Sequence, residues 1–491
     1  MNFLGGPIGN QLIFYPVVIG FIYTAYCQYK KQDVLVDFNK FKRFVFFYVG
    51  VIFISLIVGL YKYPYYDLIT NGPINQIEKL PIVLNFLQGY GIIVDSNFAV
   101  GIWMIARVIK GVFLEVLYTF GLSYMIYCWY KDNFEKAMFI LNKGLILSLI
   151  ILIGYSGIEI FYLAGNEFAK NILSIINPYI HAIKTQVNWW PPLLWKGQMR
   201  SIFSEPSHIG NSSALIIPFL WCEILRKDKC NIFLVLGTFL FSCMIFLTKA
   251  RTANAMFFGM FFILSIFLLM NFKEWIKKYI LICGISLLSF MASLYFINNF
   301  MVANKMVEKQ VTASTKSQTS VFISDNVASL ASDTKRSNGA RYALLRSNMR
   351  VAIDNPVLGV GKGLASAYIM DNFTESERRN PEINMWLNHI EKKGILKYSL
   401  GAMNEYVGRF AQTGLIGLGM FLLPFIFVIY CLFKLYVKQK CFDSFFLLFA
   451  LISSLVVAMN GSITLMYNVW ILLPLTYIAI NKDVDEKLNN E

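Results

Sequence analysis

The chain has 491 residues, of which 57% are hydrophobic, 16% aromatic and 15% charged. This composition excludes a soluble protein with one core, because many apolar windows reach the length of about 18 to 25 residues that crosses a bilayer. Strands of about ten residues with alternating polarity are absent, which excludes a transmembrane β-barrel. The sequence therefore predicts an all-α polytopic membrane protein.

The formal net charge of +15 would suit a nucleic-acid-binding protein. Most Lys and Arg residues, however, stand at the ends of predicted helices, where cations set membrane orientation and meet anionic headgroups. We therefore expect topology to explain the charge, with no nucleic-acid partner. The eight cysteines lie in or beside predicted helices without zinc-binding spacing. They predict neither a disulfide nor a metal site.

The apolar stretches predict about eleven spanning helices, with a large loop before the last three. Their ranges are 8–27, 44–61, 104–129, 144–165, 208–225, 231–248, 252–271, 279–298, 411–433, 443–459 and 464–481. The stretch LPIVLNFLQGYGIIVD (80–95) is apolar but short and broken by glycine. It is either interfacial or a twelfth span.

Five basic clusters support this map, because all of them fall on the same side of the membrane. They are Lys30/Lys31/Lys40/Lys42/Arg43, Lys131/Lys136/Lys143, Arg226/Lys227/Lys229, Lys273/Lys277/Lys278 and Lys434/Lys438/Lys440. The positive-inside rule makes that side cytoplasmic, with the N-terminus outside and the C-terminus inside. The predicted parts are N-terminal transmembrane helices (1–165), an extracytoplasmic interfacial segment (166–207), central transmembrane helices (208–298), a large extracytoplasmic loop (299–410), C-terminal transmembrane helices (411–481) and a cytoplasmic tail (482–491).

The large loop is expected to be folded, because aromatic and aliphatic residues persist along it. Its early part, VTASTKSQTSVFISDN (311–326), is rich in Ser and Thr. A helical pattern follows at 339–354 and is ended by Asn355-Pro356. Gly359, Gly361 and Gly363 then predict a tight turn; facing outward, it is not expected to bind a nucleotide.

The stretch SEPSH (204–208) places a glutamate and a histidine directly before an apolar run. Ser204 is a favourable N-cap and Pro206 suits a first helical turn, so a helix N-terminus able to attract anions is expected here. Glu205 either favours the helix dipole or takes part in chemistry. His208 is either a polar interface residue or a functional one. Upstream, Trp189, Trp190 and Trp195 are typical interface anchors.

Basic residues on the predicted outer side run against the topological trend. Lys249 and Arg251 stand between two spans, where they either serve function or reach the headgroups. Arg341, Arg346 and Arg350 share the 339–354 pattern, where they either bind a ligand or form a solvated face.

Together with Arg200, these cations would suit an outer-face diphosphate, because arginine forks match phosphate oxygens. A diphosphate at a membrane surface suggests a polyprenyl-pyrophosphate-linked substrate.

Four stretches in this order resemble the bacterial O-antigen polymerase and O-antigen ligase superfamily. They are RSIFSEPSHIG (200–210), LTKARTA (247–253), ARYALLRSNMRVAIDNPVLGVGKG (340–363) and NEYVGRFAQTGLIGLGMFLLP (404–424). The likeness covers roughly residues 195–440. It implies a metal-independent glycosyltransferase of the bacterial inner membrane that needs no cofactor. Its active site would face the periplasm, and its partners would be an undecaprenyl-pyrophosphate-linked oligosaccharide, membrane lipid and, as a further candidate, a chain-length regulator.

The resemblance also suggests roles for the site residues. The expected catalytic residues are Glu205, His208, Arg251 and Arg341, and the expected substrate- or pyrophosphate-binding residues are Arg200, Lys249, Arg346, Arg350, Asn404 and Glu405. Cations would stabilise the departing pyrophosphate, while Glu205 or, after it, His208 or Glu405 would accept the proton of the attacking hydroxyl. The short helix and the turn at 359–363 would close over the sugars.

One position favours a polymerase over a ligase. Ligases resemble one another in a His-Asn pair, whereas this chain has Met403 before Asn404. Besides the ligase, two alternatives remain at this point: a protein oligosaccharyltransferase and, outside the enzymes, a flippase for lipid-linked oligosaccharides. The large outer loop and the absence of an internal repeat disfavour the flippase.

Overall fold

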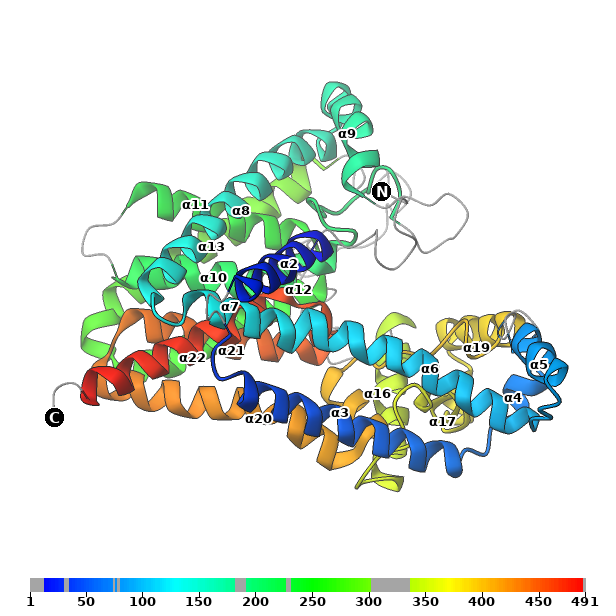
Figure 1. The fold of residues 1–491 in the computed structure, drawn as a ribbon. Helices are drawn as coiled ribbons and strands as arrows, with labels where there is room; N and C mark the ends of the chain where they lie inside the picture. Colours follow the sequence, from blue (N-terminus) through cyan, green and yellow to red (C-terminus); the bar gives the residue numbers. More distant parts are fainter. Residues whose placement is uncertain are drawn as a thin grey trace.

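The computed structural model describes residues 13–30, 35–73, 76, 80–181, 191–226, 231–301 and 336–488. Within these ranges the regular secondary structure is entirely helical (Figure 1). Seven of the described helices are long and apolar enough to cross a membrane. The prediction of an all-α polytopic membrane protein is therefore confirmed.

Each predicted span overlaps a described helix, although the sequence predicts about eleven spans and seven of the described helices are long and apolar enough to cross a membrane. The helices are α2 (Phe14–Tyr29), α3 (Phe38–Tyr61), α6 (Ser96–Val116) continuing into α7 (Leu122–Tyr130), α8 (Phe134–Leu163), α10 (Ile209–Arg226), α11 (Ile232–Leu247), α12 (Arg251–Met270), α13 (Phe272–Asn299), α20 (Glu405–Gln439), α21 (Phe442–Val457) and α22 (Tyr467–Leu488). A π-helical turn, Leu117–Gly121, joins α6 to α7.

Helix α6 begins well before the predicted residue 104. The reason is a cap, since Asp95 Oδ2 accepts hydrogen bonds from the backbone N–H groups of Asn97 and Phe98 at 3.0 and 3.1 Å. The apolar stretch at 80–95 forms only the ten-residue helix α5 (Leu80–Gly89). Ten residues rise about 15 Å, half the thickness of a bilayer core, so α5 is not a twelfth span.

Two of the basic clusters meet at one end of the bundle, where Lys278 Nζ donates to Leu225 O, next to Arg226, at 2.8 Å. There, Arg226 at the end of α10 pairs with Asp443 at the start of α21 at 3.2 Å, and Lys482 near the end of α22 pairs with Glu135 at the start of α8 at 3.3 Å. This shared end agrees with the single basic side in the predicted map. Lys31, Lys227 and Lys229 lie outside the described residues.

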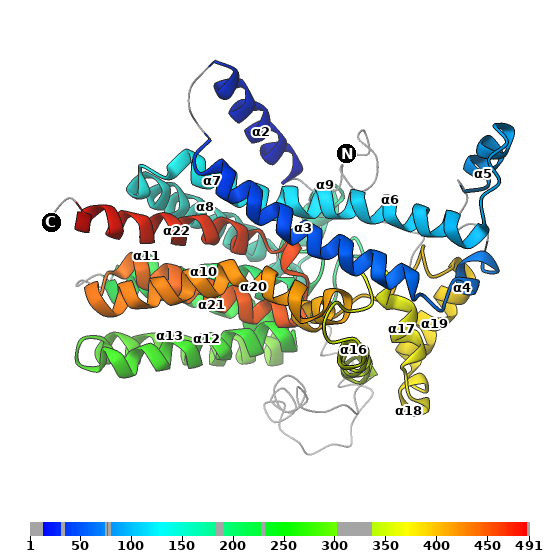
Figure 2. The same cartoon turned by 60° about the horizontal axis from the view of Figure 1, so that its bottom comes forward.

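Two hydrophobic cores divide the molecule. The larger core lies among the bundle helices. The smaller one joins the far ends of α3 and α6 to the large loop, and includes Leu56, Met104, Leu344, Ile369 and Trp386. Figure 2 shows α3 and α6 running past the bundle to this outer lobe.

The outer lobe contains several short helices, in keeping with the expected folded loop. They are α4 (Asp67–Thr70), α16 (Arg336–Asp354), α17 (Ala365–Asp371), α18 (Glu375–Arg378) and α19 (Pro381–Lys393). Helix α16 ends directly before Asn355-Pro356, as predicted. The Ser- and Thr-rich stretch 311–326 lies outside the described residues, and the predicted domain boundaries remain predictions.

The glycine-rich turn docks into a break in α20. The backbone N–H groups of Val360 and Gly361 donate to the carbonyls of Ala411 and Gln412 at 3.0 and 2.9 Å, and Leu415 N donates to Pro356 O at 2.8 Å. The turn therefore supplies hydrogen-bond partners for the backbone groups that the break exposes, as a low-dielectric environment requires. Here the turn supports the helix bundle, and its glycines are not among the residues that line the cavity described below.

Gly414 forms the break with a φ of 66° and a ψ of −170°. A Cβ atom there would collide with the backbone of Val357 and Leu358. We expect Gly414→Ala to lower the free energy of unfolding by more than about 2 kcal/mol, because it combines a strained φ with a backbone clash. The thermal unfolding midpoint of purified protein in detergent measures this.

Gly419→Ala is the matched control on the same helix, because a Cβ atom at that position meets nothing within 4 Å. Its midpoint should stay or rise slightly, in line with the helix preference for Ala of up to about 1 kcal/mol. Equal midpoints for both variants would contradict the docking role of Gly414.

Candidate functional site

A cavity of about 830 Å³ lies beside the start of α10. Its walls come from α8, from the segment that leads into α10, from the first turns of α12, from α16 and from the connection between α21 and α22. Glu205, His208 and Arg341, three predicted catalytic residues, line it together. Leu145 and Leu152 of α8 form an apolar wall in the same cavity. The cavity thus has both a polar and an apolar part.

The SEPSH stretch contributes Glu205, Ser207 and His208 to the polar part of the cavity. Glu205 has extended backbone angles and precedes a 3₁₀ turn, Pro206–His208, that leads into α10. The prediction that Ser204 caps this helix is wrong, because Glu205 holds the cap position. The Ser204 hydroxyl lies 2.9 Å from Nδ1 of His208 instead. Ser207 Oγ donates to the Glu205 carboxylate over a long 3.4 Å. No ion pair to Glu205 exists among the described residues, so its carboxylate is not neutralised.

Arg341 enters the cavity from α16, and Arg251 holds this helix in place. The Nη1 group of Arg251, at the start of α12, donates to Oδ1 of Asn338 at 3.0 Å. Asn338 precedes Arg341 by one helical turn. Arg251 itself does not line the cavity, although its neighbour Thr252 does. The structure thus brings the two predicted catalytic arginines near one another in different roles.

Lys249 and Arg200 lie outside the cavity wall. Lys249 follows α11 in a left-handed conformation with a φ of 49°, and burial lowers the pKa of its ammonium group. Arg200 is 1% exposed. Its Nη2 donates to Leu193 O at 3.1 Å, and its guanidinium lies over the Trp195 ring. Trp189 and Trp190 are outside the described residues.

Arg346 and Arg350 bind a carboxylate of the outer lobe. Their guanidinium groups lie 3.1 and 2.8 Å from Oε1 of Glu377. Burial raises the pKa of Glu377, but the hydrogen bonds from Arg350 and Thr374 outweigh it and hold the pKa below its usual range. Both arginines therefore fix α16 to α18, and neither lines the cavity.

Residues 236–422 match a protein-family model described as O-antigen ligase. No curated protein and no solved structure gives a significant match. The family match places residues 236–422, well under half of the chain, in the O-antigen ligase and polymerase superfamily. Within the match lie Arg251, Arg341 and the start of α20, whereas Glu205 and His208 precede it.

The superfamily's ligase histidine corresponds, by resemblance, to Met403, which lines the cavity here. The next residue, Asn404, caps α20: its side chain accepts from the N–H groups of Tyr406 and Val407 at 3.0 and 3.1 Å. Glu405 is buried, and its Oε2 accepts from Ile463 N at 3.1 Å. Both polar residues thus serve local structure and lie outside the cavity lining.

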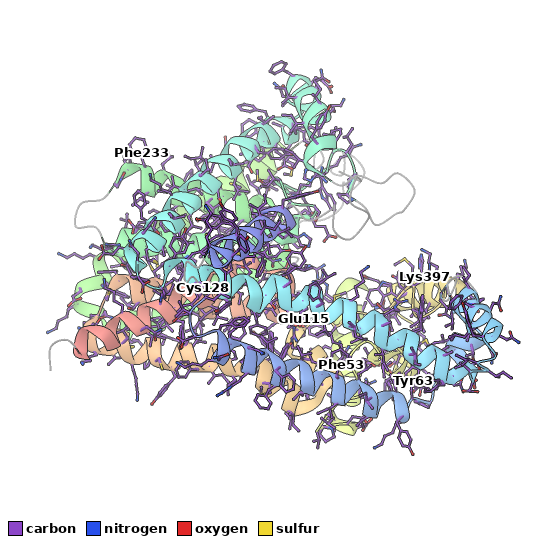
Figure 3. The ribbon with its side chains drawn as sticks, in the orientation of Figure 1. Phe53, Tyr63, Glu115, Cys128, Phe233 and Lys397 are labelled. Atoms are coloured by element: carbon purple, nitrogen blue, oxygen red, sulfur yellow. The ribbon has the colours of Figure 1, made fainter. Side chains whose placement is uncertain are left out.

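A buried ionic network, which the sequence reading did not identify, lies between the bundle and the outer lobe. Glu115 of α6 accepts from the Tyr48 hydroxyl at 3.1 Å and from Arg409 Nη2 at 2.8 Å, and its other oxygen pairs with Lys362 of the glycine-rich turn. Arg409 also pairs with Glu405. Figure 3 places Glu115 between the bundle and the outer lobe. Two carboxylates and two cations balance the buried charge.

The network reaches the cavity wall through Glu405. Ile463, whose N–H binds Glu405, accepts from Trp470 Nε1 at 2.9 Å through its carbonyl. This fixes the connection between α21 and α22, which presents Asn460 and Ser462 to the cavity. The sequence does carry one signal for this network: Glu115 is a charged residue within an apolar stretch. Charged residues inside membrane helices are rare and mark functional or structural sites.

Glu115→Gln should lower the free energy of unfolding by about 3 to 5 kcal/mol, because the buried Arg409 and the partly buried Lys362 would be left as two cations with one carboxylate. Adding Lys362→Met restores the charge balance, because Arg409 then faces Glu405 alone. The double variant should therefore be more stable than the sum of the two single losses predicts. Thermal unfolding in detergent measures all three variants.

Glu135→Gln provides the control, because the Glu135 carboxylate is exposed and its pair with Lys482 is a surface pair. It should leave the unfolding midpoint nearly unchanged. If the stability losses of Glu115→Gln and Lys362→Met simply add in the double variant, the two side chains do not stabilise one another.

Proposed function

We propose that the protein is a polymerase of lipid-linked oligosaccharide repeat units. It transfers the growing glycan from undecaprenyl pyrophosphate to the next lipid-linked unit, without a metal ion. The reaction takes place at the extracytoplasmic face of the bacterial inner membrane.

The observation that carries this proposal is the shared cavity of Glu205, His208 and Arg341. A lipid-linked sugar diphosphate has a polar head and a long apolar chain. The polar part of the cavity suits the sugars and the diphosphate, and the wall formed by Leu145 and Leu152 suits the first part of the chain. The superfamily match supports glycan transfer over lipid flipping.

The proposed reaction is a single displacement. An acceptor hydroxyl oxygen bonds to the anomeric carbon of the donor, the bond from that carbon to the pyrophosphate oxygen breaks, and undecaprenyl pyrophosphate leaves with the electron pair. Arg341 stabilises the charge that develops on the leaving group. Arg251 keeps α16, and with it Arg341, at the cavity. A single displacement inverts the configuration at the anomeric carbon.

Glu205 is the proposed base for the hydroxyl proton. It lines the cavity, and no cation neutralises it among the described residues. Glu405, the other candidate carboxylate, is held by Arg409 and by the backbone of Ile463. His208 lies in the same wall and is the second candidate.

The ligase is the alternative within the superfamily, in which the finished glycan moves to the lipid A core. Met403 favours the polymerase, because a thioether cannot replace a basic histidine at this cavity position. A protein oligosaccharyltransferase would share the donor chemistry and differ in the acceptor.

Glu205→Gln should reduce polymer formation by about 100-fold or more, in the range of general-base loss, because it removes the proton acceptor but keeps the shape. Ser207→Ala is the matched control and should retain most activity. Formation of long glycan from a purified lipid-linked repeat unit in vesicles measures both. A greater loss of polymer formation in Ser207→Ala than in Glu205→Gln would indicate that Glu205 has a structural role and is not the base.

Arg341→Ala and Arg251→Ala should each abolish polymer formation while the protein remains in the membrane. Arg346→Ala, on the same α16 helix but bound to Glu377, is the comparison and should retain more activity. Near-normal amounts of glycan from both Arg341→Ala and Arg251→Ala would contradict the proposed stabilisation of the departing pyrophosphate.

A gel of surface glycolipid from a strain that lacks the gene distinguishes the two superfamily reactions. Core with a single repeat unit and no ladder supports the polymerase. Bare core, with long chains retained on the lipid carrier, supports the ligase. An unchanged ladder contradicts both for this glycan.

A further inference from the structure

Helix α9 (Glu167–Ile180) has three distinct faces. Ala169, Leu173 and Asn177 are buried against the rest of the protein. Glu167 and Asn171 are exposed and polar. The third face carries large apolar side chains: Phe168, Ile175 and Tyr179 are 74%, 69% and 88% exposed. A helix in water needs only a buried face and a polar face, so the exposed apolar face requires another explanation.

The position of α9 identifies the surface that covers this face. It begins directly after the membrane-spanning helix α8, whose last residue is Leu163. Near that end, α8 exposes the large apolar side chain of Phe161, as expected of a helix that meets lipid. Figure 1 shows α9 at the far end of α8, away from α20 and α22. The exposed apolar face of α9 therefore follows closely in the chain on an exposed apolar side chain of a membrane-spanning helix.

The buried face connects α9 to the cavity wall. Asn177 Oδ1 accepts from the Tyr155 hydroxyl at 2.6 Å, and its Nδ2 donates to Leu193 O at 2.6 Å. Leu193 O also accepts from Arg200. The Glu159 carboxylate of α8 then binds the N–H groups of Arg200 and Ser201 at 3.1 and 2.7 Å. This chain of contacts ends where the SEPSH segment begins.

We propose that α9 is an interfacial helix whose Phe168, Ile175 and Tyr179 side chains insert into the leaflet at the C-terminal end of α8. Its polar face, with Glu167 and Asn171, lies toward the headgroups and water. Through Asn177, this insertion fixes the depth of the segment that carries Glu205 relative to the membrane surface. The binding of lipid by α9 does not depend on the proposed glycan chemistry.

Spin-label accessibility in vesicles of phosphatidylethanolamine and phosphatidylglycerol tests this proposal. The nitroxide is attached to single cysteines introduced at positions 168, 175 and 179 on the apolar face, with the native cysteines replaced. Glu167→Cys and Asn171→Cys on the same helix are the matched controls. Collision with molecular oxygen reports the bilayer, and collision with a water-soluble nickel chelate reports the aqueous phase.

We expect the ratio of oxygen to nickel accessibility to be several-fold higher at the three apolar positions than at the two controls. Nickel access at all five positions would place α9 in water and overturn the proposal. Shielding of the apolar face from both reagents would also overturn it: spin–spin coupling would then indicate a second copy, and its absence another protein surface. An unchanged unfolding midpoint in detergent for each labelled variant shows that the fold is intact.

Discussion

Arg409 occupies the position on which the arrangement of the outer lobe depends. Its guanidinium lies between two carboxylates, donates to the Tyr48 hydroxyl at 2.6 Å and stacks over the Phe421 ring at 3.7 Å. A buried guanidinium is costly unless its charge is balanced and its donors are paired. Satisfying this one group requires α3, α6 and α20 to meet at one point. Lys362 then brings the glycine-rich turn to the same place.

The broken helix α20 adds a second constraint at this point. A helix interrupted near a membrane leaves backbone groups that water cannot reach, and they must find protein partners. The turn at 356–363 supplies them, and Ser55 Oγ donates to Leu358 O and Gln412 O at 2.5 and 2.9 Å. The outer lobe is thus attached through backbone hydrogen bonds as well as ion pairs. This attachment lets α16 present Arg341 to a cavity formed by other helices.

The arginines of the outer side divide into two groups by their partners. Arg346 and Arg350 share Glu377, so their charge is already balanced inside the lobe. Arg341 reaches a cavity, where a charged ligand can meet it. The same residue type on one short helix therefore has structural and proposed chemical roles. Distances to carboxylates, more than position in the sequence, separate the two.

The sequence by itself determined the all-α membrane architecture, the approximate positions of the long apolar helices and the stop of α16 at Asn355-Pro356. These features follow from local properties: apolar length, basic flanks and the missing N–H of proline. The start of α6 at Ser96 was predicted too late, because a cap at Asp95 extends a helix beyond its apolar stretch. The resemblance also indicated Glu205, His208 and Arg341, which the structure places in one cavity.

Only the tertiary structure decided which charged groups meet. The contacts of Glu115 with Lys362 and Arg409 join residues 247 and 294 positions apart. No local pattern specifies such pairs, because the fold brings them together only when several helices pack at once. For the same reason the sequence could not separate Arg341 from Arg346, or show that Glu405 supports a backbone segment. Local sequence sets which elements form, and long-range packing sets which side chains remain available for chemistry.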